Sequence, residues 1–220
     1  MVFARSAAMA FNRYIDRDID KANERTATVR EIPNGSIKPK AALIFVIVNC
    51  VLFVATTFFI NDLCFYVSPI ALLVVFGYSL TKRFTALCHL ILGVGLALAP
   101  IGAYLAVTGS FAWLPLYISF AVLFWVAGFD MIYALQDEEF DKKMGLSSIP
   151  AKIGRRATLN LSVLFHIITA GYLIAAAYHA NAGFLFWLGT AIFISLLVYQ
   201  HLLVKPNDLS KVNIAFFTTN

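Results

Sequence analysis

Residues 41–60 read AALIFVIVNCVLFVATTFFI, a run with no charged side chain. A transmembrane helix needs about 20 consecutive apolar residues to cross the hydrocarbon core of a bilayer, so this run can cross it alone. Five more runs have similar length and composition. They are residues 63–80, 87–107, 114–135, 157–178 and 182–204. The sequence therefore predicts an all-α fold, a polytopic bundle of transmembrane helices.

The overall composition excludes an ordinary soluble domain. Hydrophobic residues make up 60% of the 220 residues and charged residues only 13%, whereas soluble domains carry about 25% charged residues. Six long apolar helices in a soluble protein of this length would leave too little polar surface to cover them.

The basic residues divide the connecting segments into two sets. All 17 Lys and Arg lie in alternate connections or on the N-terminal helix that leads into them. These connections are residues 17–40, 81–86, 136–156 and 205–211. Basic loops stay in the cytoplasm, so this face of the bundle is expected to be cytoplasmic. The net charge of +5 thus reflects topology, and no nucleic-acid partner is expected because no nucleic-acid-binding motif accompanies it.

The first cluster of acids ends the N-terminal apolar stretch, where residues 11–20 read FNRYIDRDID. Asn12, Asp16 and Asp20 are spaced i, i+4, i+8, which puts them on one face of a continuous helix. Asp18 falls on the far side and is expected to be solvated or to cap the helix.

A second cluster has the same spacing, in residues 130–141, DMIYALQDEEFD. Asp137 and Asp141 are again four residues apart. Asp130 lies two helical turns before Asp137 and is expected on the same face, together with Tyr133. The intervening Glu138 and Glu139 are expected to be surface charges.

Carboxylates at i, i+4 repel each other and destabilise a helix, so the repeated arrangement needs an explanation. Ionisable groups next to hydrocarbon usually face a cavity and mark function. Two such sets on one membrane side indicate facing carboxylates with a cation between them, and oxygen-only ligands favour a hard ion such as Mg²⁺. Two alternatives remain: solvated helix ends balanced by nearby Arg and Lys, and a cation- or proton-coupled membrane transporter that uses the same acids.

These motifs resemble those of the UbiA superfamily of intramembrane prenyltransferases. The family motif NxxxDxxxD matches residues 12–20, and its DxxxD motif, preceded by an Asp and a Tyr, matches residues 130–141. The loop residues Asn-Glu-Arg-Thr at 23–26, with Arg30 and Gly35, and the basic turn YSLTKRFT at 78–85 also fit. The resemblance extends over essentially the whole chain and is nearest to 4-hydroxybenzoate polyprenyltransferases.

The resemblance implies both an architecture and an activity. Family members have nine transmembrane helices and this chain supplies about seven, so residues 1–220 are expected to be a single transmembrane domain, truncated at both ends. The implied reaction is Mg²⁺-dependent transfer of a polyprenyl group from polyprenyl diphosphate to a small hydroxylated aromatic acid, in ubiquinone or menaquinone biosynthesis. The implied location is the bacterial cytoplasmic (inner) membrane, with the active-site side facing the cytoplasm and the lipid bilayer as a partner.

The resemblance also implies roles for individual residues. One Mg²⁺ is expected on Asn12, Asp16 and Asp20, and a second on Asp137 and Asp141 with Asp130 in support. The residues expected to bind the diphosphate substrate are Lys82, Arg83, Arg17 and Tyr133. The residues expected to be catalytic are Asp16, Asp20, Asp137, Asp141 and Arg83. Lys82 and Arg83 have a simpler alternative role, as charges that only set the topology.

Overall fold

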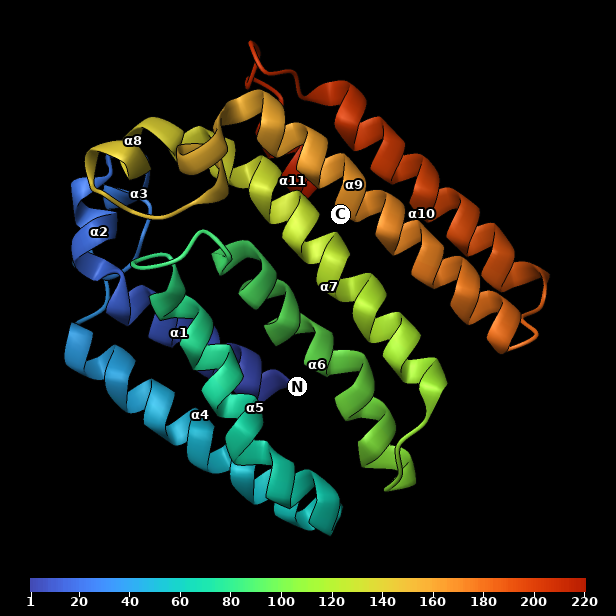
Figure 1. Cartoon of the computed structure of the whole chain (residues 1–220). Coiled ribbons are helices and arrows are strands. Elements are labelled where there is room, and N and C mark those ends of the chain that lie inside the picture. The colour runs from blue at the N-terminus through green and yellow to red at the C-terminus, as the bar shows by residue number, and fades with distance from the viewer. The chain divides into compact units, whose positions relative to one another are not determined.

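The computed structural model describes all residues 1–220, and apart from one isolated bridge between Lys205 and Asp208 its regular structure is entirely helical (Figure 1). Six helices are long and apolar enough to cross a membrane. They are α4 (Pro39–Ile60), α5 (Asp62–Thr81), α6 (Cys88–Thr108), α7 (Trp113–Ala134), α9 (Ile149–His179) and α10 (Phe184–Leu203). Each corresponds to one predicted run, and only α9 begins much earlier than expected. The predicted all-α transmembrane fold is confirmed.

Shorter helices lie between and beside these six. They are α1 (Val2–Ile15), α2 (Arg17–Ala22), α3 (Glu24–Ala27), the 3₁₀ turn η1 (Leu135–Asp137), α8 (Glu138–Lys143) and α11 (Val212–Phe217). Both acidic motifs reach into this set, and Asp16 and Asp137 stand where a longer helix gives way to a short one.

The chain forms two compact units, and α6 contributes to both. The first unit comprises Met1–Leu80 and Gly102–Ser110. In this unit α1 packs along α4, and Phe11 of α1 meets Phe76 of α5 with ring centroids 4.7 Å apart. Asn61, which separates α4 from α5, donates from Nδ2 to the carbonyl oxygen of Leu105 at 2.9 Å. The single-domain organisation stays a prediction.

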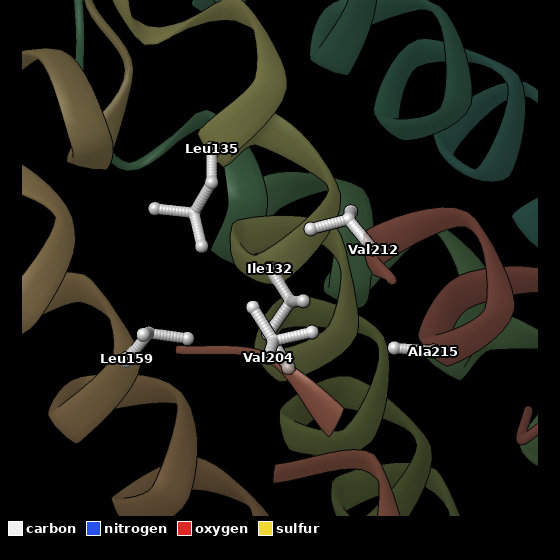
Figure 2. Packing of buried hydrophobic residues seen from close by; sticks show 6 residues of the cluster. All are labelled: Ile132, Leu135, Leu159, Val204, Val212 and Ala215. Carbon is white, nitrogen blue, oxygen red and sulfur yellow. The ribbon is translucent and has the colours of Figure 1, made fainter. Parts of the chain in front are cut away.

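The second unit comprises Thr81–Ile101 and Phe111–Asn220. Its centre is the packing of α7 along α9, with α10 on another side of α9 and α11 against α7 and α10 (Figure 1). Figure 2 shows where these elements meet: six buried apolar side chains point toward one another. They are Ile132, Leu135, Leu159, Val204, Val212 and Ala215. This cluster fixes the end of α7 from which the second acidic motif continues.

Large apolar side chains stay exposed along the long helices. On α4, for example, Val51 is 62% exposed and Phe59 is 84% exposed. Lipid has no hydrogen bonds to offer the backbone, and a helix satisfies its own N–H and C=O groups while it presents such side chains outward. The exposed apolar surface is therefore what a bilayer-facing helix requires.

Candidate active site

The first acidic motif spans a helix junction, so the prediction of one continuous helix is wrong here. Helix α1 ends at Ile15, α2 begins at Arg17, and Asp16 stands between them with φ −90° and ψ 6°. This backbone region is sparsely populated and is one in which many active-site residues are found.

The helical spacing of the first motif nevertheless survives the junction. The backbone N–H of Asp16 donates to the carbonyl of Asn12 at 3.0 Å, and that of Asp20 donates to the carbonyl of Asp16 at 2.7 Å. The side chain of Asn12 also donates to Asp16, from Nδ2 to Oδ2 at 2.9 Å. Asn12 and Asp16 are thus brought together as predicted.

Asp20 is buried, and the following loop holds it in place. The residue is only 9% exposed, and its backbone carbonyl accepts a hydrogen bond from Thr26 Oγ1 at 2.8 Å. Thr26 lies in α3, whose first turn is capped by Asn23 through its Oδ1 and the backbone N–H of Arg25. A side-chain cap of this kind satisfies a helix N–H that has no partner in the helix.

Arg17 makes only local contacts. Its Nη1 donates to the carbonyl of Tyr14 at 2.8 Å, its guanidinium lies 4.8 Å from the centre of the Tyr14 ring, and its Nη2 is 3.7 Å from Asp18. These contacts hold the guanidinium beside the junction between α1 and α2. The proposed diphosphate contact of Arg17 stays a prediction.

The second motif also crosses a junction. Helix α7 ends at Ala134, one 3₁₀ turn follows, and Asp137 stands before α8 with φ −102° and ψ 5°. A 3₁₀ turn advances about 120° per residue instead of about 100°, so three such residues rotate the following side chains by roughly 60°. The helix is therefore not continuous from Asp130 to Asp141. The shared face of Asp130 and Asp137 stays a prediction.

The most enclosed acid of this motif is Asp141, which is 0% exposed. The Nζ of Lys82 lies 2.7 Å from its Oδ1, and its Oδ2 has no hydrogen-bond partner. Burial lowers the pKa of the Lys82 ammonium. The attraction of the Asp141 carboxylate and of other nearby groups outweighs this effect, so the pKa of Lys82 lies above its ordinary value. Lys82 is therefore a cation at neutral pH.

One loop holds the backbones of both partners. The N–H of Leu146 donates to the carbonyl of Asp141 at 2.9 Å, and the N–H of Ser147 donates to the carbonyl of Lys82 at 2.8 Å. The loop turns at Gly145, whose φ of 67° lies in the left-handed region that glycine adopts readily. Lys82 and Asp141 are thus fastened to adjacent residues of a single turn.

Glu138 is buried, so the prediction that it is a surface charge is wrong. The residue is 6% exposed, and its carboxylate pairs with Lys142 at 2.6 Å and with Arg155 at 2.7 Å. Arg155 follows Gly154, where a φ of 77° breaks α9. Glu139, by contrast, has a side chain that is 79% exposed, as expected. The ion pairs of Glu138 join α8 to α9 beside the acidic motif.

Asp130 binds a histidine. His89 Nδ1 lies 2.6 Å from Asp130 Oδ2, and His89 is only 3% exposed. The backbone N–H of Ile149 lies 3.4 Å from His89 Nε2 and donates to it, so Nδ1 carries the proton that His89 donates to Asp130. The pair connects α6, α7 and the start of α9.

Two other predicted residues, Arg83 and Tyr133, differ in their exposure. Arg83 is exposed. The ring of Tyr133 packs against Phe216 with centroids 4.2 Å apart and meets Phe217 at 6.2 Å, so it contacts α11. Their proposed roles stay predictions.

Acids of both motifs contact polar or basic side chains, such as Asn12 beside Asp16 and Lys82 beside Asp141. Within either unit, no three His, Cys, Asp or Glu side chains gather closely enough to hold a metal ion. The donor set still fits a hard divalent cation, because it offers oxygen ligands and Asp141 Oδ2 is a buried carboxylate oxygen with no partner. A metal site shared by both motifs stays a prediction.

The fold and these acidic helix junctions define an integral membrane protein with carboxylates at the ends of several of its helices. The whole chain, residues 1–220, matches the UbiA prenyltransferase family, and it belongs to that family. It is similar to a 4-hydroxybenzoate octaprenyltransferase of a Shewanella species, at 30% identity over 220 residues, all of this chain and 76% of that protein. Family membership favours a prenyltransferase over the transporter alternative.

Two solved structures have the same fold. A UbiA homologue from Aeropyrum pernix, solved without ligand, matches 99% of this chain and 82% of its own, with a TM-score of 0.91 and 28% identity. A UbiA homologue from Archaeoglobus fulgidus, bound to DMAPP and Mg²⁺, matches 99% of this chain and 81% of its own, with a TM-score of 0.74 and 22% identity. The second likeness concerns the fold alone.

Proposed function

We propose that this protein transfers a polyprenyl group from polyprenyl diphosphate to a small hydroxylated aromatic acid, with Mg²⁺ as cofactor. The observation that carries the proposal is the fully buried Asp141 carboxylate beside the Lys82 ammonium, in a chain of the UbiA prenyltransferase family. A polyprenyl diphosphate has an anionic head and a long apolar tail. A charged site at the end of membrane-spanning helices suits both parts.

The carboxylates would hold the metal and the basic side chains would bind the phosphate oxygens. We assign Asn12, Asp16 and Asp20 to one ion, and Asp137 with Asp141 to another. When bound, Mg²⁺ would act as a Lewis acid that offsets negative charge on the diphosphate.

Lys82 and Arg83 are the proposed diphosphate ligands. Lysine binds phosphate as a point charge, whereas the arginine fork can bind two oxygens at once. Arg83 is exposed and therefore accessible to a ligand. Both groups stabilise the negative charge that grows on the diphosphate as the bond from its oxygen to the allylic carbon breaks. The allylic carbon then bonds to the aromatic ring, and the ring loses a proton.

Asp130 has a different proposed role. Its carboxylate accepts the Nδ1 proton of His89 at 2.6 Å, and it supports the second motif from the preceding part of α7. The pair fixes the backbone of α7 relative to α6 and the start of α9 before the chain turns into η1.

The acceptor and pathway are proposed from relatives. Several similar proteins are named 4-hydroxybenzoate octaprenyltransferase, at 28% to 30% identity. We therefore propose an acceptor of the 4-hydroxybenzoate kind and a place in quinone biosynthesis.

The proposed location is the bacterial cytoplasmic membrane, with the acidic motifs on the cytoplasmic side. Support comes from six helices that are long and apolar enough to cross a membrane and from the basic residues, which fall in alternate connections. In intact cells, a membrane-impermeant maleimide should label Ser110→Cys and not Lys143→Cys in a background without native cysteines. The reverse pattern would overturn the orientation.

The reaction is tested with purified protein in nanodiscs. Labelled polyprenyl diphosphate and a panel of hydroxylated aromatic acids are supplied with Mg²⁺ or with EDTA. A prenylated product that forms only with Mg²⁺ would establish the reaction and identify the acceptor. A folded protein that gives no product with any acceptor would contradict the proposal.

A further inference from the structure

The surrounding structure holds the ion pair between Lys82 and Asp141 in place. The two charged atoms are 2.7 Å apart, the carboxylate side chain is 0% exposed, and the lysine side chain is 35% exposed. Adjacent residues Leu146 and Ser147 hold the backbone carbonyls of Asp141 and Lys82. The pair therefore does not depend on a chance surface encounter of two flexible side chains.

The two partners differ in their freedom to move. Asp141 is held by its carbonyl, by full burial and by α8, which Glu138 joins to α9 through Arg155. Besides the ion pair itself, Lys82 is held at its backbone carbonyl by Ser147, and its longer side chain is 35% exposed. If the pair opens, Lys82 is the partner that moves.

A metal ion at Asp141 would meet the Lys82 ammonium at close range. Two cations near one carboxylate repel each other strongly where water is excluded. A diphosphate offers oxygen atoms that accept an ammonium, so it provides Lys82 with another partner when a metal ion takes Asp141.

We infer that Lys82 is an exchangeable counter-ion of Asp141, which moves to the diphosphate when a divalent metal ion binds the carboxylate. This inference rests on the proposed function and adds a coupling between two ligands. Lys82 opposes the binding of metal alone and favours the binding of metal together with diphosphate. By linkage, each ligand must then raise the affinity for the other by the same factor.

The test measures binding without turnover. Mn²⁺ is titrated into purified protein and followed by electron paramagnetic resonance, with and without inorganic pyrophosphate. The variants are Lys82→Met and, as a second neutral side chain that can still donate a hydrogen bond, Lys82→Gln. Lys143→Met is the matched control, because Lys143 is an exposed lysine two residues after Asp141.

Coupling energies of this kind usually change an affinity by about 5- to 150-fold. In the wild type and in Lys143→Met, pyrophosphate should raise the Mn²⁺ affinity about tenfold or more. In Lys82→Met and Lys82→Gln, Mn²⁺ alone should bind about tenfold more tightly than in the wild type, and pyrophosphate should add little.

Thermal unfolding provides a second readout. Removal of Lys82 leaves a buried carboxylate without its cation, which destabilises a protein. Mn²⁺ alone should therefore raise the unfolding temperature of the Lys82 variants more than that of the wild type.

Two results would overturn the inference, and they are distinguishable. Lys82 variants that bind Mn²⁺ alone no more tightly than the wild type, with pyrophosphate coupling intact, would reject the exchange and leave the proposed function standing. Absence of Mn²⁺ binding from every protein, with or without pyrophosphate, would reject the exchange and the metal-dependent function together.

Discussion

The two acidic motifs use the same backbone device and different supports. Asp16 and Asp137 each stand at a break between a longer helix and a shorter one, with φ −90° and ψ 6° at Asp16 and φ −102° and ψ 5° at Asp137. In the first motif, Asn12 donates a hydrogen bond to Asp16, and Thr26 donates one to the carbonyl of Asp20. The second is held by ion pairs, Lys82 with Asp141 and Glu138 with two basic residues.

This difference indicates what each support provides. A hydrogen bond from a neutral amide leaves the charge of a carboxylate in place, whereas Asp141, paired with the Lys82 ammonium, must exchange one cation for another. The helix junction, which occurs in both motifs, sets the positions of the carboxylates. The neighbouring charges determine how readily each carboxylate accepts a metal ion.

The comparison predicts that both motifs are required for the reaction. Asp16→Asn and Asp137→Asn should each lower the rate of prenyl transfer by at least about 100-fold, the scale on which loss of one charged group acts at a reacting centre. Both side chains keep their size, so both proteins should stay folded by circular dichroism. Wild-type turnover in either variant would break the equivalence of the motifs.

A smaller effect is expected from the ion pairs that support only the second motif. Glu138→Gln removes the charge that binds Lys142 and Arg155, and groups that orient metal ligands typically contribute 10- to 100-fold to affinity. The Mg²⁺ concentration for half-maximal turnover should rise about tenfold. Glu139→Gln is the control, since that side chain is 79% exposed and its 3.7 Å contact with Arg155 lies at the surface, where such pairs contribute little. An equal rise in both variants would contradict a specific role of the buried Glu138.

The helix that carries the second motif has a tight contact of its own. A Cβ added to Gly128 of α7 would collide with the His166 ring of α9, and overpacking of this kind costs about 1–3 kcal/mol. Gly128→Ala should therefore lower the free energy of unfolding in detergent by that amount. Gly171→Ala in α9 meets open space and should not destabilise the protein, so equal loss in both variants would contradict the packing argument.

The weakest expected effect concerns the support of the first motif. Thr26→Val removes the hydrogen bond from Oγ1 to the carbonyl of Asp20 at 2.8 Å and keeps the side-chain shape. The expected loss of stability is about 1 kcal/mol, the usual contribution of one hydrogen bond. Thr56→Val is the matched control, since Thr56 is exposed and bonds only within its own helix. Chemical unfolding of both variants would show the difference.

Hydropathy was sufficient to predict the transmembrane helices, because a spanning helix needs a long apolar run and little else. The spacing of Asn12, Asp16 and Asp20 agrees with the backbone hydrogen bonds that join them four residues apart, although the helix breaks at Asp16. The junctions at Asp16 and Asp137 were missed, since the sequence carries no proline or glycine at either place and packing decides the backbone there.

The supporting contacts of the second motif were harder to predict. Glu138 and Arg155 are 17 residues apart, and His89 and Asp130 are 41 residues apart. Only the spacing of Glu138 and Lys142, at i, i+4, offered a local signal. Contacts between separate helices depend on how those helices pack, and periodicity within one helix does not encode that.

The proposal that both motifs bind metal around one diphosphate has a direct measurement. Mn²⁺ bound per chain is counted by electron paramagnetic resonance at saturating pyrophosphate, in the wild type, Asp16→Asn and Asp137→Asn. We expect two bound ions in the wild type and fewer, or much weaker, binding in each variant. Wild-type stoichiometry and affinity in either variant would show that its motif does not hold the metal.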